Sequence, residues 1–169
     1  MLISPLHRYL SDLLENIRPM TAGTVNPVTA TATQPDISKL AITLTTVNGF
    51  QYSSGDSDHR FAIQSIAKVF AYGLALDDLG SAELAKRIDV EPSGDPFNEI
   101  SLQSGTGRPA NPMINAGAIA TVGQIKGRGG VDRLSRITGI MDLAAEGSPG
   151  ELEINRTVYH AENLNGHRN

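Results

Sequence analysis

The sequence predicts an α+β fold in which helices pack on an antiparallel sheet. Three observations favour this class: an amphipathic helical pattern near the N-terminus, a β-hairpin pattern in residues 40–53, and a succession of helical patterns from residue 64 onward. The 169 residues are 40% hydrophobic and 19% charged, a composition typical of globular proteins. Because this length suits one ordinary domain, we expect residues 1–169 to form a single domain.

The first helix is expected to begin at residue 5. Ser4 fits an N-cap, and Pro5 fits the first helical position. Apolar side chains then recur every three or four residues, as in an amphipathic helix; they are Leu6, Leu10, Leu13, Leu14 and Ile17. Pro19 ends the pattern. Residues 20–38 are rich in Thr, Ala and Pro without periodicity, and they predict irregular chain.

A β-hairpin is expected next. Residues 40–47 alternate in the manner of a strand and are rich in β-branched side chains. Asn48-Gly49 is a strong hairpin-turn signal, residues 50–53 supply the return strand, and a turn starts at Gly55. Since about three strands are needed for an independently stable sheet, either further strands lie in the later loops or additional chain completes the sheet.

Helical patterns account for most of the remaining chain. Ile66, Phe70 and Leu74 lie four residues apart, and Gly80 follows where helices often end. We expect helices over residues 64–79, 81–88, 116–125, 131–141 and about 151–162. A long ordered loop at 91–112 and glycine-rich breaks at 127–130 and 147–150 separate them.

Composition excludes several classes of function. The net charge is −4 and no long basic cluster occurs, which argues against a nucleic-acid partner. There is no cysteine, and the four histidines lack metal-ligand spacing, so we expect no thiolate chemistry, no metal and no cofactor. The chain has neither a signal-peptide pattern nor an apolar run of about 20 residues, so we expect a soluble cytoplasmic protein without membrane contact.

Ser65 and Lys68 form the candidate catalytic pair. A serine hydroxyl needs a base within about 3 Å, and residues three apart on a helix share a face. Free N–H groups and the positive dipole end at a helix start favour an oxyanion and disfavour an ammonium group. Burial among Phe61, Ile66 and Phe70 would further lower the lysine pKa. The alternative is an ordinary exposed Ser and Lys, because S-x-x-K also occurs by chance.

Two longer motifs place this pair in a wider pattern. They are Q-S-I-A-K-V-F at residues 64–70 and N-P-M-I-N-A-G-A-I at residues 111–119, accompanied by shorter segments at 55–56, 76–80, 91–94, 162 and 166–169. With these motifs, the sequence from about residue 23 onward resembles the serine-dependent glutaminase family. That family's fold is related to β-lactamases and penicillin-binding proteins, so the resemblance implies a β-lactamase-like fold.

The resemblance also implies a reaction and a set of site residues. The reaction is deamidation of L-glutamine to L-glutamate and ammonia, with an acyl-enzyme on Ser65 and Lys68 as general base. Asn115, Glu162 and Asn169 are then expected to bind substrate together with Ser65, and the protein is expected to be a homo-oligomer. From the residues alone, Asn115 could instead cap the following helix, and Glu162 could be a solvated surface charge.

Two departures from the family pattern limit the expectation. The block that normally carries a tyrosine near the substrate reads V-N-P-V-T-A at residues 25–30. Family members are also close to twice as long, so we expect a partial domain with weak or no activity on its own. The alternatives are an inactive fragment that acts as an interaction module, or an S-x-x-K enzyme that acts on β-lactams. The second is disfavoured by the motif at 111–119 and by the lack of an S-D-N triplet.

Overall fold

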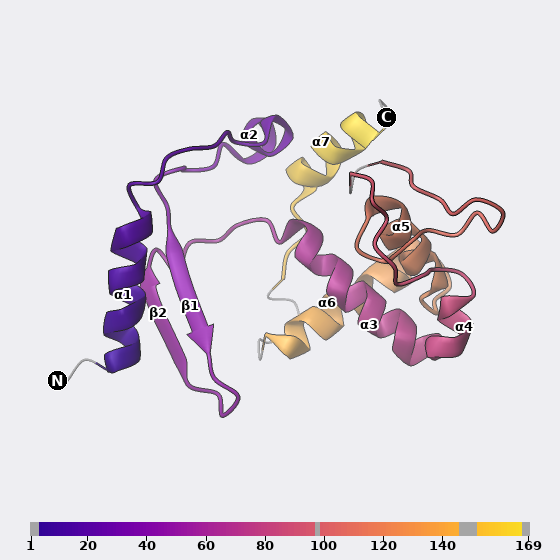
Figure 1. Cartoon of the computed structure of the whole chain (residues 1–169), viewed down its shortest axis with the longest axis horizontal. Coiled ribbons are helices and arrows are strands. Elements are labelled where there is room, and N and C mark those ends of the chain that lie inside the picture. The colour runs from indigo at the N-terminus through magenta and orange to yellow at the C-terminus, as the bar shows by residue number, and fades with distance from the viewer. Residues whose placement is uncertain (1–3, 97–98, 146–151, 167–169) are drawn as a thin grey trace. The chain divides into compact units, whose positions relative to one another are not determined.

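The computed structural model describes residues 4–96, 99–145 and 152–166, and Figure 1 shows its helices and strands. The chain forms two compact units: unit 1 comprises Met1–Ala62 and Ile154–Asn169, and unit 2 comprises Ile63–Glu153. Helices combine with an antiparallel strand pair, which confirms the predicted α+β class. That residues 1–169 act as a single domain stays a prediction.

Unit 1 contains the predicted hairpin with a helix packed on it. Helix α1 (Pro5–Ile17) lies against strands β1 (Ala41–Thr45) and β2 (Gln51–Gly55) (Figure 1). The strands pair antiparallel in a register that runs from Ala41 opposite Gly55 to Thr45 opposite Gln51. The amphipathic pattern correctly predicted this helix. Of its apolar residues, Leu10 and Leu14 are buried, whereas Leu6 and Leu13 are exposed.

The hairpin differs from the prediction at its ends. The first strand covers Ala41–Thr45 and not 40–47, and the return strand begins at Gln51, one residue later than expected. Beyond the strand ends, the Thr46 N–H donates to the Phe50 carbonyl at 2.9 Å. Gly49 takes a φ of 85° inside this loop, which explains the glycine. At the other end, Gly55 belongs to β2, whereas the sequence predicted a turn there.

Unit 1 also contains two helices that the sequence predicted wrongly or imprecisely. Residues 20–38 are not entirely irregular, because α2 spans Pro27–Thr33 and packs against α7 (Arg156–Gly166). The predicted helix at about 151–162 starts later, since Asn155 Oδ1 accepts hydrogen bonds from the N–H groups of Thr157 and Val158, both at 3.1 Å. This side-chain cap fixes where α7 begins.

Unit 2 is a helical unit with its own hydrophobic core. Helix α3 (Ala67–Leu79) packs against α5 (Asn115–Gln124), α6 (Gly130–Ala144) and the short α4 (Ser81–Ala85) (Figure 1). The buried residues of this core are Ala71, Leu74, Ala75, Leu84, Ile88, Ile125, Ile137 and Met141. The predicted helices of this region are confirmed with shifted ends. Residues 64–66 form a 3₁₀ turn instead of α-helix, and α4 ends at Ala85.

A partly buried ion pair links α3 to α6. The Arg136 guanidinium donates to both oxygens of Asp78 at 2.5 and 2.8 Å, and the Lys126 N–H donates to the same carboxylate at 2.7 Å. The Asp78 side chain is only 5% exposed. Its hydrogen bonds with Arg136 lower the pKa of Asp78 from 3.8 to about 2, so this carboxylate stays charged over the physiological range.

The predicted loop between α4 and α5 is ordered over its described residues. Arg108 organises it, because the guanidinium donates to the Ala85 carbonyl at 2.6 Å, to Gln103 Oε1 at 2.7 Å and to the Asp89 carboxylate. One isolated bridge, Leu102 with Pro109, is the only strand-like pairing outside the hairpin in the described residues. No described helix is both long and apolar enough to cross a membrane.

Candidate active site

Ser65 occupies the centre of the 3₁₀ turn Gln64–Ile66, directly before α3. Its side chain is exposed, and the preceding residue, Gln64, has a φ of 50°. Few residues other than glycine adopt that left-handed conformation, and it is often found at functional sites. The turn therefore presents the Ser65 hydroxyl to solvent beside the N-terminal end of a 13-residue helix, where backbone N–H groups and the helix dipole favour negative charge.

Lys68 lies in the first turn of α3 and reaches toward the start of α5. Its Nζ donates hydrogen bonds to the Met113 carbonyl at 2.9 Å and to Asn115 Oδ1 at 2.7 Å. Partial burial lowers the pKa of Lys68 below its ordinary value, which is the predicted direction. The predicted source of that burial is wrong in part, because Phe61 is 78% exposed and Ile66 is 53% exposed.

The structure brings Lys68 together with Asn115 but does not pair Lys68 with Ser65. Among the described residues, the Ser65 hydroxyl makes no hydrogen bond to the Lys68 amine, although the two residues lie one helical turn apart. A base–nucleophile contact can form when substrate is bound even where it is open without substrate. The Lys68 amine is thus held by two hydrogen-bond acceptors, and Ser65 lies three residues earlier, in the 3₁₀ turn before α3.

Asn115 does not cap α5, so the alternative expectation for this residue is wrong. Asn111 lies before the helix, and its Oδ1 accepts hydrogen bonds from the N–H groups of Met113 at 3.0 Å and Ile114 at 3.1 Å in the turn that precedes α5. Asn111 therefore shapes this turn, whereas the side-chain oxygen of Asn115 accepts a hydrogen bond from Lys68. Because a lysine amine donates, the Asn115 oxygen is the atom that faces it.

The remaining predicted site residues belong to the C-terminal segment. Glu162 lies in α7 of unit 1 and is exposed. Asn169 lies outside the described residues. Their expected role in substrate binding is therefore not tested by the contacts of Lys68 and Asn115.

Sequence reasoning missed two features of this region. The Met113 carbonyl is a backbone atom, and its contact with Lys68 has no side-chain signature. Its place two residues before Asn115 in the motif at 111–119 was the only available hint. The left-handed backbone at Gln64 also has no compositional signal, since glycine or asparagine is the usual residue at such a position.

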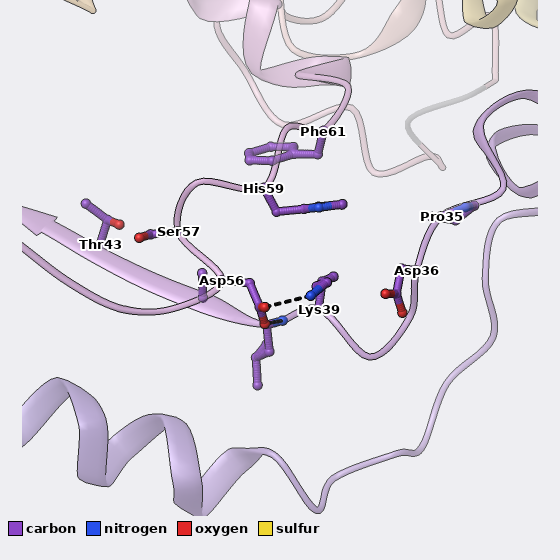
Figure 2. Close-up of a pocket in the computed structure, with 10 residues that line it drawn as sticks. Pro35, Asp36, Lys39, Thr43, Asp56, Ser57, His59 and Phe61 are labelled. Carbon is purple, nitrogen blue, oxygen red and sulfur yellow. Dashed lines mark hydrogen bonds and ion pairs between the residues drawn. The ribbon is translucent and has the colours of Figure 1, made fainter.

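Metal-ligand clusters and pockets outside the Lys68 region are the other features by which a site could be recognised in the described part of the chain. The described residues contain no group of three or more His, Asp or Glu side chains that could hold a metal ion. A shallow pocket of about 440 Å³ lies in unit 1, and the Lys39–Asp56 ion pair, with Nζ and Oδ1 2.9 Å apart, forms part of its wall (Figure 2). None of its lining residues is a predicted site residue.

Comparison with known proteins agrees with the motif pattern. The family model described as Glutaminase matches residues 23–169. A glutaminase of Nostoc sp. (strain PCC 7120) is 40% identical over 168 residues, which are 98% of this chain and 49% of the relative. A glutaminase of Corynebacterium glutamicum is 41% identical over 169 residues, which are 100% of this chain and 40% of the relative. The chain thus spans about half the length of these curated relatives or less.

Solved structures give the same result. The crystal structure of Mglu in its L-glutamate binding form is 33% identical with a TM-score of 0.87, and the match covers 99% of this chain and 38% of that one. A Bacillus glutaminase is 29% identical with a TM-score of 0.80 over 96% of this chain and 51% of that one. The family match covers most of the sequence and both motifs around Lys68 and Asn115, and the chain therefore belongs to the glutaminase family.

Proposed function

We propose that this chain contributes the nucleophile and base of an amidohydrolase that deamidates L-glutamine to L-glutamate and ammonia. The observation that carries the proposal is the contact of Lys68 with Asn115 and the Met113 carbonyl. It joins the S-x-x-K motif to the N-P-M-I-N motif at one place, beside the helix start that holds Ser65. The glutaminase relatives, and the L-glutamate binding form of Mglu, support glutamine as the substrate.

The reaction begins with attack of the Ser65 hydroxyl oxygen on the side-chain amide carbon of glutamine. Lys68, as a neutral amine, accepts the hydroxyl proton, and the positive end of the α3 dipole favours the oxyanion. The intermediate collapses with cleavage of the C–N bond, and Lys68 returns the proton to the departing ammonia. Water then hydrolyses the γ-glutamyl ester on Ser65 and releases glutamate.

Glutamine carries an α-carboxylate, which needs hydrogen-bond donors, and an α-ammonium group, which needs a carboxylate partner. With its oxygen turned to Lys68, Asn115 keeps its amide N–H groups for an oxygen of the substrate. In this proposal Glu162 pairs with the α-ammonium group, and Asn169 supplies further amide contacts. The homo-oligomer expected from the family resemblance stays a prediction, as does a cytoplasmic location.

Ammonia release from L-glutamine tests the proposal. The wild-type chain is compared with Ser65→Ala and Lys68→Ala, each of which should lower turnover by about 10²-fold or more, because each removes a group that takes part in bond making or proton transfer. Ser81→Ala and Lys86→Ala are matched controls, since both side chains are exposed at the start and end of the neighbouring α4.

The outcomes separate the competing functions. Full activity in Ser65→Ala would remove Ser65 as the nucleophile. No ammonia release from a wild-type chain with a cooperative unfolding transition would favour the alternative, an inactive fragment that acts only as an interaction module. Acylation of Ser65 by a β-lactam in mass spectrometry, without glutamine turnover, would favour the β-lactam alternative.

A further inference from the structure

The start of α5 divides two tasks between two asparagines. Asn111 shapes the turn that precedes the helix, because its side-chain oxygen accepts hydrogen bonds from the N–H groups of Met113 and Ile114. Asn115 is the first residue of α5 and makes no cap. Its oxygen instead accepts a hydrogen bond from Lys68 at 2.7 Å. At Asn115 the contact with Lys68 therefore takes the place of a capping contact.

The two acceptors around Lys68 are arranged to fix its amine. A neutral lysine amine has two N–H groups and one lone pair. The Met113 carbonyl and Asn115 Oδ1 each accept a hydrogen bond from this nitrogen. Both acceptors lie where the turn before α5 joins the helix. They therefore set the side-chain conformation of Lys68 and the direction of its lone pair. We propose that Asn115, together with the Met113 carbonyl, is a positioning residue that orients the Lys68 amine as the base.

This inference rests on the proposed function, since it concerns how Lys68 acts as the base. The two hydrogen bonds of Lys68 can nevertheless be tested without measuring turnover. The two acceptors favour the protonated amine, whereas burial favours the neutral form and lowers the pKa of Lys68. A base that must take a proton and then return it benefits from such opposed effects. The hydrogen bonds strengthen when the lysine becomes charged, and burial drives the proton back.

The turn that carries both acceptors is held from several sides. Gly117 is buried against the Asn111 carbonyl, and a methyl group at Gly117 would fall on that oxygen. The Asn111 amide also donates to the Glu91 carbonyl at 3.0 Å. Positioning of a catalytic group depends on such support, because small displacements of a reacting group cost much of its rate.

The test measures the pKa of Lys68 itself. The chain has four lysines, at positions 39, 68, 86 and 126, so NMR titration of ¹³C-labelled lysine side chains gives four signals, and loss of one in Lys68→Arg identifies Lys68. Asn115→Asp is nearly isosteric and places a carboxylate against the amine. It should raise the Lys68 pKa by about one unit or more. Asn115→Leu removes the acceptor and should lower that pKa below the wild-type value.

Controls separate this role from a purely structural one. Gln124→Glu adds the same charge near the other end of α5, about 13 Å along the helix, and should leave the Lys68 pKa within about 0.2 units of wild type. If Asn115→Leu fails to fold, Asn115→Asp still decides, because an acidic residue is favourable at a helix start. A folded Asn115→Asp chain with an unshifted Lys68 pKa would overturn the inference. That result would leave the ammonia-release test of Ser65 and Lys68 unaffected.

Discussion

Unit 1 and unit 2 bury their apolar side chains in different ways. In the described part of unit 1, the buried hydrophobic residues are Leu10 and Leu14 on α1, which packs on a two-stranded sheet with polar side chains such as Thr43, Ser53 and Ser54. In unit 2, residues from α3, α4, α5 and α6 and from the segments after α4 and α5 form one hydrophobic cluster. The polar interactions of unit 2 are also more buried, with Asp78 as the clearest example.

This difference separates the parts of the candidate site. Lys68 and Asn115 lie on α3 and α5, two helices that share the larger core, and Ser65 sits at the N-terminal end of α3. A base must be held to within a fraction of an ångström, and helices packed on a common core do this better than loops. Glu162, by contrast, lies in unit 1. The proposed pair, Ser65 and Lys68, therefore belongs to the better-packed unit, and perturbing each unit separately tests this difference.

The largest difference is expected from one substitution made in each unit. Leu84→Ala in unit 2 should cost about 4 kcal/mol, because Leu84 is almost fully buried among cluster residues that cannot close the cavity. Leu14→Ala in unit 1 should cost about 2 kcal/mol, since a single helix on a hairpin can relax more easily. Hydrogen exchange with mass spectrometry follows each unit by its own peptides. Equal losses of protection in both units would contradict the comparison.

Gly117→Ala should destabilise unit 2 by roughly 3 kcal/mol. The added methyl group would overlap the Asn111 carbonyl, a backbone atom that cannot move without breaking the turn before α5. Gly123→Ala on the same helix is the matched control, because a methyl group there meets nothing within 4 Å. It should leave stability unchanged or raise it by up to about 1 kcal/mol. Urea denaturation measures both, and a neutral Gly117→Ala would show that the turn is less rigid than its contacts imply.

The Asp78 carboxylate should give a stability contribution that depends on pH. Its pKa falls from 3.8 to about 2 on folding, so the contribution is fully present above about pH 4 and is lost as the pH falls toward 2. The size is about 2 kcal/mol. Asp78→Asn should therefore lower the unfolding free energy at pH 7 and match wild type near pH 2. A constant difference across that range would mean that Asp78 acts through packing and not through its charge.

Sequence patterns predicted the elements whose signals are local. The leucine spacing of α1, the Asn48-Gly49 hairpin and Gly80 at the end of α3 were all identified correctly. Helix α2 was missed although Asn26-Pro27 repeats the Ser4-Pro5 start signal, because its body is rich in threonine and its support comes from α7, more than a hundred residues away. Tertiary contact outweighed weak local propensity there.

The candidate site shows the same division between local and distant information. Ser65 and Lys68 could be predicted from spacing, and Asn111 from its place before a proline. The hydrogen bond between Lys68 and Asn115 joins residues 47 positions apart, and no periodicity encodes it. The Met113 carbonyl is a backbone atom, so no side-chain pattern could predict its contact with Lys68. The sequence therefore suggested the groups of the candidate site, and their role stays a prediction. Their hydrogen-bond partners required the packing of α3 against α5.

The smallest effect is expected from the exposed ion pair of unit 1. Lys39 is 40% and Asp56 is 30% exposed at the side chain, so water and salt screen their attraction. Asp56 also accepts the Leu40 N–H at 3.1 Å, and this hydrogen bond survives when Lys39 is removed. Lys39→Met should therefore shift the thermal midpoint by less than about 2 °C, and the shift should shrink further in 1 M salt. A shift in the thermal midpoint as large as that of Asp78→Asn, or one that salt leaves unchanged, would contradict this expectation. It would show that the Lys39–Asp56 pair stabilises unit 1 as strongly as the Asp78–Arg136 pair stabilises unit 2. The difference between the two units would then not include their ion pairs.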